Sequence, residues 1–393
     1  MSPGRRLAVV VSHPIQYYVP LYRALAREPS IELHILFASR FGLETTFDWE
    51  MNVDVAWATD LTAGYSHEFL PEADGIKQIG FRDVDNPSVA GALARFKPDA
   101  AIIHGYAMMT MLRALAWCRL HSARAILASD SSAHGSPPGL RRTVKNMTLP
   151  WLLRQFGAAL TMSDRAEQHL ASLRYPRARM FRTPMMIDEG FWRAREQRPI
   201  RRARKRAELG LADDEFVVLS VAKLAPRKRM LDILAALSKL GVEHSTRRVT
   251  LLVAGDGEQK EALKSFAAER GLSTRFLGFV NIDALPELYA AADALVHAAE
   301  AEQYGMVVLE AAVMGLPLIL SDETGAIGPT SIARPESNTL VFPRGDVAAL
   351  AKALARLRDD SDLRRRLSDA SRTISNDHAG PFSVAAVLKA ISA

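Results

Sequence analysis

The segment 295–320, LVHAAEAEQYGMVVLEAAVMGLPLIL, constrains the fold of this chain most, because it reads as strand, loop, helix and strand in succession. An apolar run ends in small residues, and a polar loop with Glu302 follows. A helix carrying Glu310 then ends at Gly315–Pro317, before the apolar run Leu318–Leu320. Strands that alternate with helices in this way are typical of a parallel sheet in an α/β fold.

The loop before this helix has the features of a nucleotide-sugar site. Seven residues separate Glu302 from Glu310, so one acid lies in the loop, the other about two turns into the helix, and both can face one ligand. The backbone N–H groups of Gly305, Met306 and Val307 lie at the helix start, where unpaired donors and the helix dipole attract phosphate. Carboxylates on either side can accept hydrogen bonds from sugar hydroxyls. The alternative is two surface acids on an amphipathic helix.

The spacing of the two acids, followed by Met314-Gly315-Leu316-Pro317, resembles family 4 of the retaining glycosyltransferases with the GT-B fold. The hallmark of that family is E-x7-E before a small-residue-Gly-Leu-Pro turn. The resemblance implies that Glu310 binds the donor ribose and that Glu302 binds the transferred sugar. It also implies transfer with retention of the anomeric configuration, with no cofactor and no required metal.

A second candidate for donor binding follows the apolar run Phe216–Val221. Lys223 and Lys228 lie in the loop between this predicted strand and a helix, where two cations can grip a diphosphate and neutralise it as it leaves. The resembled family normally has Arg at the first position, so the chain keeps the charge there and loses the bidentate fork. Arg227 and Arg229 are candidates to compensate.

The first half of the chain opens with a short apolar run, Leu7–Val11, typical of a buried parallel strand. The loop His13-Pro14-Ile15-Gln16-Tyr17 that follows lies at the carboxyl edge of the predicted sheet, where open α/β folds bind ligands. It resembles a bacterial branch of the same family, whose other members are mostly Gly-rich here. We expect His13 and Gln16 to contact the acceptor or the donor phosphate. A loop packed by its own aromatic residues is the alternative.

Two further polar positions follow predicted strands. His104 comes after the run Ala100–Ile103, and the resemblance implies that it contacts the transferred sugar; a satisfied core histidine is the alternative. Asp130 follows Ala125–Ala128 and is a candidate for acceptor hydroxyls. His104, Glu302 and Lys228 form the predicted catalytic set.

The length of 393 residues is too great for one ordinary core. Two halves in which strands alternate with helices predict an α/β protein of two Rossmann-like domains facing across a cleft. The resemblance implies that this is the GT-B fold, with a C-terminal helix crossing back to the first domain. The predicted domains are residues 1–190, which bind the acceptor, residues 191–375, which bind the nucleotide-sugar, and residues 376–393, the returning helix.

The chain has one cysteine, Cys118, which excludes an intrachain disulfide and favours the reducing cytoplasm. No Cys/His cluster suggests zinc, and we discount the metal-binding D-x-D interpretation of Asp83-Val84-Asp85 because no strand precedes it. The N-terminal apolar run is too short for a signal peptide, and no run of about eighteen apolar residues predicts a membrane span.

The net charge of +6 favours anionic partners, and much of it lies in Arg193–Arg206 and around Arg141. We expect the first stretch to be the hinge between the domains, where periodicity is lost. For both stretches, a solvated face and peripheral association with the inner membrane surface remain open. Nucleic-acid binding is not expected, because no RNA module or helix-turn-helix accompanies the charge.

The resemblance to this family implies a hexosyltransferase. It would move a sugar from a nucleoside diphosphate sugar, with UDP or GDP as the carrier, to a glycan or lipid-linked acceptor in bacterial surface polysaccharide synthesis. The alternatives are a nucleotide-sugar epimerase or phosphorylase on the same fold, or a non-catalytic nucleotide- or membrane-binding protein.

Overall fold

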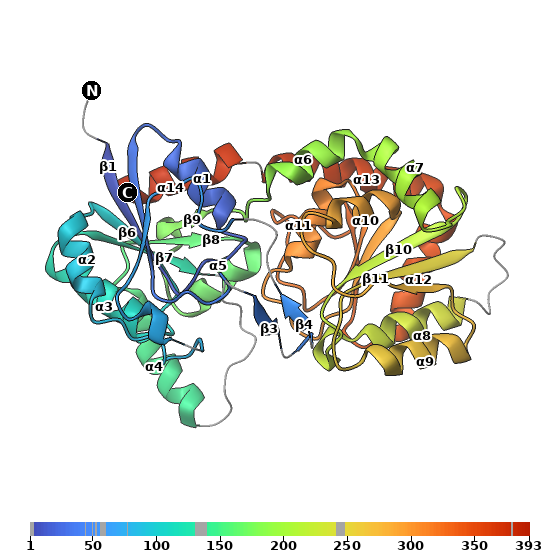
Figure 1. The fold of residues 1–393 in the computed structure, drawn as a ribbon, viewed down its shortest axis with the longest axis horizontal. Coiled ribbons are helices and arrows are strands. Elements are labelled where there is room, and N and C mark those ends of the chain that lie inside the picture. Colours follow the sequence, from blue (N-terminus) through green and yellow to red (C-terminus); the bar gives the residue numbers. More distant parts are fainter. Residues whose placement is uncertain are drawn as a thin grey trace. The chain divides into compact units, whose positions relative to one another are not determined.

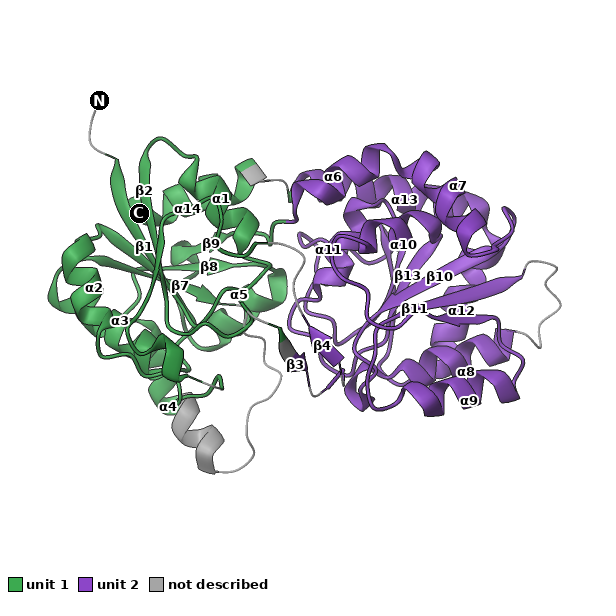
Figure 2. Cartoon of the chain, in the orientation of Figure 1, with its two compact units in different colours: residues 1–46, 59–186, 378–393 green, residues 47–58, 187–377 purple. Residues whose placement is uncertain are grey.

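The computed structural model describes residues 4–43, 45–48, 50–51, 53–55, 60–76, 78–129, 140–240, 248–378 and 380–393. The chain divides into two compact units (Figure 2). Unit 1 comprises Met1–Thr46, Thr59–Met186 and His378–Ala393, and unit 2 comprises Phe47–Ala58 and Ile187–Asp377. The segment Phe47–Ala58, which the sequence analysis placed in the first domain, groups with unit 2.

Unit 1 is built on a seven-stranded parallel sheet in the order β5-β2-β1-β6-β7-β8-β9 (Figure 1). Its strands are β1 (Arg5–Val11), β2 (Ile31–Phe37), β5 (His67–Phe69), β6 (Ala100–His104), β7 (Arg124–Ser129), β8 (Ala158–Thr161) and β9 (Met180–Arg182). The central strands are continuous apolar runs because helices cover both faces of the sheet.

One face of this sheet packs on helices whose Leu, Ala and Met side chains form a single core. These helices are α2 (Val89–Phe96), α3 (Met109–Leu120), α4 (Leu140–Leu153) and α5 (Asp164–Ser172). The free thiol of Cys118 is buried in this core. Short 3₁₀ turns occur at η1 (Ala73–Gly75) and η2 (Arg177–Arg179).

Helices α1 (Val19–Ala26) and α14 (Gly380–Ser392) contact each other, and α14 also contacts β7, β8 and β9. The Ser383 hydroxyl donates to the carbonyl of Pro184 at 2.8 Å, and Arg124 Nε donates to the carbonyl of Ala390 at 2.8 Å. The last helix therefore returns to the first unit, as the fold class predicted.

Unit 2 contains a six-stranded parallel sheet in the order β12-β11-β10-β13-β14-β15 and the two-stranded sheet β3-β4 (Figure 1). The strands are β3 (Thr46–Asp48), β4 (Val53–Val55), β10 (Phe216–Val221), β11 (Val249–Ala254), β12 (Thr274–Phe276), β13 (Ala294–His297), β14 (Leu318–Ser321) and β15 (Thr339–Phe342).

Helices α8 (Met230–Leu240), α9 (Lys260–Glu269), α12 (Val347–Asp359) and α13 (Ser361–Asn376) contribute to one apolar core with the unit 2 sheet. Helix α10 (Leu285–Ala291) contacts β10, and α11 (Met306–Val313) contacts β13 and β14. A 3₁₀ turn, η3 (Pro226–Lys228), precedes α8. Among the described residues, no helix has both the length and the apolar character needed to span a membrane.

The basic stretch expected to be an irregular hinge is helical instead. It forms α6 (Glu189–Glu196) and α7 (Arg198–Glu208). Several of its guanidinium groups contact the region of α10: Arg202 Nη2 lies 2.7 Å from an Asp293 carboxylate oxygen, and Arg201 pairs with Glu287. The stretch lacks apolar periodicity because α7 uses arginines on its inward face, where they bind backbone carbonyls and acids.

Arg206 is the most buried of these cations, with 2% of its surface exposed. It donates to the carbonyls of Ala291, Ala212 and Glu215, at 3.1, 2.7 and 2.6 Å. We expect Arg206→Ala to lower the free energy of unfolding of unit 2 by about 3 kcal/mol, because it leaves buried acceptors without a donor. Differential scanning calorimetry measures the change.

The matched control is Arg204→Ala, since Arg204 lies on the same helix, has a 66% exposed side chain and pairs with Glu287. We expect a loss below about 1 kcal/mol there. Equal losses for the two variants would contradict a structural role for the buried face of α7.

Candidate functional site

The loop between β13 and α11 is fixed by the loop that follows β14. The N–H of Glu302 donates to the carbonyl of Glu323 at 3.2 Å, and the N–H of Gly325 donates to the carbonyl of Glu302 at 2.8 Å. A Cβ atom on Gly325 would lie 1.7 Å from the carbonyl oxygen of Gln303, so only glycine allows this approach. Gly305 begins α11 with φ of 89°, a left-handed conformation that glycine adopts without strain.

The Glu302 carboxylate is the centre of a charged group in unit 2. Its Oε2 atom pairs with Lys228 Nζ and lies 3.2 Å from His297 Nε2. Burial opposes ionisation, but the hydrogen bond from His297 and the charge of Lys228 outweigh it and lower the pKa of Glu302 to about 2. Glu302 is therefore an anion throughout the physiological pH range.

Lys228 reaches this group from the loop between β10 and α8. It closes the 3₁₀ turn η3, and its side chain is 11% exposed. The neighbouring backbone is tied to the β13–α11 loop, because the N–H of Glu300 donates to the carbonyl of Arg227 at 2.7 Å. The carboxyl ends of β10 and β13, which are adjacent in the sheet, thus bring Lys228 and Glu302 together.

Lys223, the other predicted phosphate ligand, lies in the same loop but is paired with acids. Its Nζ lies 2.7 Å from Asp48 Oδ2 and 3.0 Å from Glu50 Oε2. Arg227, a candidate to compensate, also binds Glu50, with its Nη2 2.9 Å from both carboxylate oxygens. Arg229, the other candidate, pairs with Asp232 at 2.6 Å.

Glu310 lies in a different environment from Glu302. It is 3% exposed on α11 and accepts a hydrogen bond from the Tyr289 hydroxyl at 2.6 Å. Burial raises the pKa of Glu310 to about 7, although the Tyr289 hydrogen bond acts in the opposite direction. The two acids of the motif therefore differ in both surroundings and charge state near neutral pH. Met306 and Val307 are half-buried in the first turn of α11.

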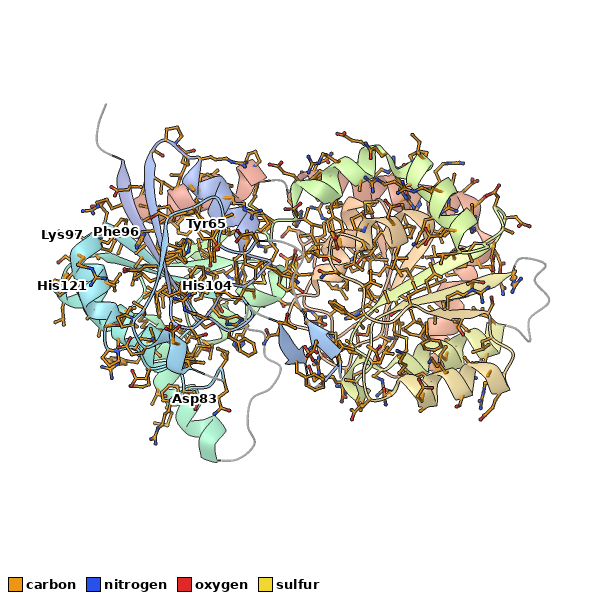
Figure 3. All side chains as sticks on the ribbon, viewed as in Figure 1. Tyr65, Asp83, Phe96, Lys97, His104 and His121 are labelled. Atoms are coloured by element: carbon orange, nitrogen blue, oxygen red, sulfur yellow. The ribbon has the colours of Figure 1, made fainter. Side chains whose placement is uncertain are left out.

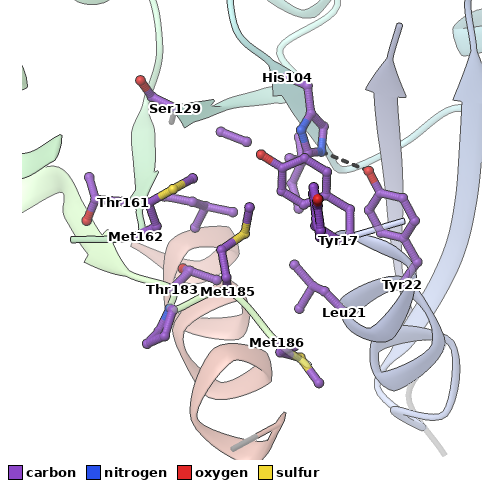
Figure 4. A pocket seen from close by; sticks show the side chains of 15 residues that line it. Tyr17, Leu21, Tyr22, His104, Ser129, Thr161, Met162, Thr183, Met185 and Met186 are labelled. Carbon is purple, nitrogen blue, oxygen red and sulfur yellow. Dashed lines mark hydrogen bonds between the residues drawn. The ribbon is translucent and has the colours of Figure 1, made fainter. Parts of the chain in front are cut away.

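In unit 1, His104 ends β6 and borders a pocket (Figures 3 and 4). Its Nε2 lies 3.0 Å from the hydroxyl of Tyr22, and its ring meets that of Tyr18 edge-on, with centroids 4.3 Å apart. Burial lowers the pKa of His104 to about 3, so the imidazole is neutral. This geometry also matches the alternative of a satisfied histidine, since one ring nitrogen already has a partner.

The predicted acceptor residues are distributed over the loop after β1 and beyond. His13 Nδ1 lies 2.9 Å from the Ser12 hydroxyl, and its ring packs against Phe41 at 5.4 Å between centroids. Burial lowers the pKa of His13 to about 4. The Oε1 atom of Gln16 is buried and has no hydrogen-bond partner among the described residues. Asp130 lies outside the described residues.

The Asp83–Asp85 triplet has partners other than a metal. Asp85 forms a two-pronged ion pair with Arg113, and Asp83 Oδ1 accepts from Gln78 at 3.0 Å (Figure 3). In the described part of the chain, no group of three or more His, Cys, Asp or Glu residues is arranged to hold a metal ion.

Sequence reasoning missed His297, Asp48 and Glu50. His297 ends β13 as His104 ends β6, so the strand-end criterion that selected His104 also applies to it. Asp48 and Glu50 had no such signal, because they are far from Lys223 in the sequence and lie in a segment without clear periodicity.

Known proteins resemble parts of this chain in sequence. Residues 201–374 match the family model described as "Glycosyl transferases group 1". The chain is 27% identical over 280 residues to the alpha-D-kanosaminyltransferase of Streptomyces kanamyceticus, covering 69% of this chain and 68% of that protein. It is 34% identical to the lipopolysaccharide core biosynthesis glycosyltransferase LpsD of Rhizobium meliloti, covering 45% of this chain and 48% of that protein.

Solved structures define the fold. HepE of Anabaena, solved in complex with UDP and glucose, is similar with a TM-score of 0.70 at 15% identity, covering 99% of this chain and 100% of that chain. A glycosyltransferase from Rickettsia africae gives a TM-score of 0.73 at 13% identity, covering 99% and 98%. The chain has the GT-B fold, and together the comparisons support a GT-B glycosyltransferase.

The raised pKa of Glu310 makes the stability of unit 2 depend on pH. Between the ordinary glutamate value of 4.5 and about 7, the folded state binds a proton that the unfolded state releases, so stability falls as pH rises through this window. We expect Glu310→Gln, which imitates the protonated acid, to remove this loss and to stabilise unit 2 by about 3 kcal/mol at pH 8. At pH 4.5 it should have little effect.

Calorimetric unfolding at both pH values measures the difference. Glu261→Gln is the control, because that glutamate has an 80% exposed side chain on α9 of the same unit. A Glu310→Gln variant with the same pH dependence as the unchanged chain would show that Glu310 is already ionised in the fold.

Proposed function

We propose that this chain is a retaining glycosyltransferase of family 4. It transfers a hexose from a nucleoside diphosphate sugar, with UDP or GDP as the carrier, to a hydroxyl of a glycan or lipid-linked acceptor. In this proposal unit 2 binds the donor and unit 1 binds the acceptor. The reaction takes place in the cytoplasm, with peripheral attachment to the inner membrane face, and contributes to surface polysaccharide synthesis.

The observation that carries the proposal is the contact between Lys228 and Glu302 beside the start of α11. The cation and the N–H groups at the helix start suit the negative charge of a diphosphate. The ionised carboxylate suits the sugar joined to it. All of these groups lie within residues 201–374, the range that matches the glycosyltransferase model. HepE, on the same fold, was solved with UDP and glucose bound.

The proposed chemistry is electrostatic. The bond between the anomeric carbon and the diphosphate oxygen breaks, and the acceptor oxygen bonds to the same face of that carbon. The acceptor proton passes to the leaving phosphate. Lys223, Lys228 and the N–H groups of α11 stabilise the departing diphosphate, and Glu302 stabilises the positive charge on the sugar. No step requires a metal or a covalent nucleophile.

The remaining residues hold the substrates. Glu310 accepts hydrogen bonds from the donor ribose, and His104 contacts the transferred sugar. His13, Gln16 and Asp130 serve the acceptor. Because Tyr289 binds Glu310 in this structure, ribose binding must share or replace that hydrogen bond.

The test is incubation of the purified chain with UDP-glucose, UDP-N-acetylglucosamine or GDP-mannose and a panel of simple glycoside acceptors, with and without magnesium. Proton NMR identifies the anomer of the product. An α-linked product from an α-linked donor, formed without magnesium, supports the proposal. Acceptor-independent isomerisation would indicate an epimerase, dependence on phosphate would indicate a phosphorylase, and binding without turnover would indicate a non-catalytic protein.

We expect Glu302→Gln to reduce the transfer rate about a hundredfold, because it removes the anion beside the developing positive charge. The affinity for nucleoside diphosphate should stay within a few-fold, since Lys228 is retained. The control is Glu300→Gln, two positions away and half-exposed, which should leave the rate unchanged. A Glu302→Gln variant with the full rate would refute the assigned role.

Asp48 and Glu50 pair with Lys223, and Glu50 also pairs with Arg227. In this proposal both acids compete with the donor diphosphate for these cations. We therefore expect Glu50→Gln to tighten the binding of nucleoside diphosphate about threefold, because exposed ion pairs of this kind contribute up to about 1 kcal/mol. Calorimetric titration measures the change. Asp54→Asn, on the neighbouring strand β4, is the control, because Asp54 is exposed. Equal affinity in both variants would mean that Lys223 and Arg227 do not contact the diphosphate.

A further inference from the structure

Unit 1 contains a pocket of about 480 Å³, counted with its open mouth, at the carboxyl edge of the sheet. It lies where β6, β7 and β8 end and is closed by the start of α1 and by residues 183–186 (Figure 4). All of the residues that line it belong to unit 1.

The side chains that line the pocket are mostly apolar. Figure 4 shows Met162, Met185 and Met186 on one side and Tyr17, Leu21 and Tyr22 on the side of α1. The polar groups are the neutral ring of His104, the hydroxyls of Ser129, Thr161 and Thr183, and the phenol hydroxyls of Tyr17, Tyr18 and Tyr22. None of the described residues lining the pocket carries a charged side chain.

This lining does not suit a phosphate or a carboxylate. An anion in such a site would lose its hydration without gaining a cation or an array of N–H donors. An apolar group, by contrast, loses contact with water and gains contact with thioethers and aromatic rings.

The side chains of the lining favour a flexible chain over a flat ring. Two of the aromatic side chains are already engaged with His104, since Tyr18 meets it edge-on and Tyr22 contacts its Nε2. Methionine side chains, with three rotatable bonds each, adjust to an occupant without a fixed shape.

We propose that this pocket binds an alkyl chain carried by the acceptor, next to the hydroxyl that receives the sugar. The inference rests on the proposed function, because it names the chemical class of the acceptor for unit 1. His104 and Ser129 then lie at the polar end of the acceptor, and the methionines and Leu21 hold its apolar end.

The test is binding of alkyl glycosides to the full chain, measured by saturation-transfer NMR below their micelle concentration. The probes are n-octyl, phenyl and methyl β-D-glucopyranoside. We expect saturation to reach the octyl protons, with an affinity at least about tenfold higher than that of the methyl glycoside. Equal affinities would overturn the proposal, and a preference for the phenyl glycoside would replace the alkyl chain by an aromatic group.

Substitutions at Met185 test whether octyl glucoside binds in this pocket. We expect Met185→Lys to weaken octyl glucoside about tenfold or more, because the ammonium would have to be buried against the chain. Met147→Lys is the matched control, since Met147 is 75% exposed on α4 of the same unit, and it should bind as the unchanged chain does. Met185→Gln, of similar size, gives a smaller loss if the lysine variant fails to fold. Unchanged affinity in Met185→Gln and Met185→Lys would place the alkyl chain elsewhere.

UDP and GDP binding is measured on the same samples, since the donor is assigned to unit 2. Nucleotide binding without octyl binding would refute the pocket alone. Octyl binding at Met185 without nucleotide binding or transfer would refute the proposed function and leave the pocket as an alkyl-binding site.

Discussion

The ion pair between Lys228 and Glu302 is the interaction on which the arrangement of unit 2 depends. It joins the loops that follow two adjacent parallel strands, β10 and β13, and His297 supports it from the end of the second strand. A half-buried carboxylate without these partners would be protonated or displaced. The contact therefore fixes both the charge of Glu302 and the entry of the chain into α11.

The same motif contains a second acid in the opposite state. Glu302 is held ionised by a cation and a histidine, and Glu310 is buried with a phenol as its partner. Carboxyl groups whose surroundings separate their pKa values are suited to different tasks. An anion beside a sugar cation and a hydrogen-bonding group beside a ribose are two such tasks, which is the division that the proposed function assigns to these residues.

Strand–helix alternation was sufficient to predict two Rossmann-like domains, and the family resemblance carried by the acid motif predicted the GT-B fold, because apolar strands and short motifs are local properties of the sequence. The loop at Lys228 and the strand end at His104 were found in the same way. The partners of Lys223 were not, since Asp48 and Glu50 come from a distant segment whose pairing depends on tertiary packing. Helix α7 was missed because buried arginines replace the apolar stripe that usually marks an inward face.

Ion pairs of similar composition have different consequences in this chain. On α7, Arg202 and Arg206 satisfy carbonyls and acids of their own unit, so the charge of these two arginines is not available to a partner. The positive composition of this stretch is therefore not by itself evidence for membrane attachment. At Lys223 and Arg227 the pairs are half-exposed, so their contribution to stability is small and an anionic ligand could replace Asp48 and Glu50 at little cost. The degree of burial, rather than the number of charges, therefore separates the cations that hold the fold from those that remain suited to binding a ligand.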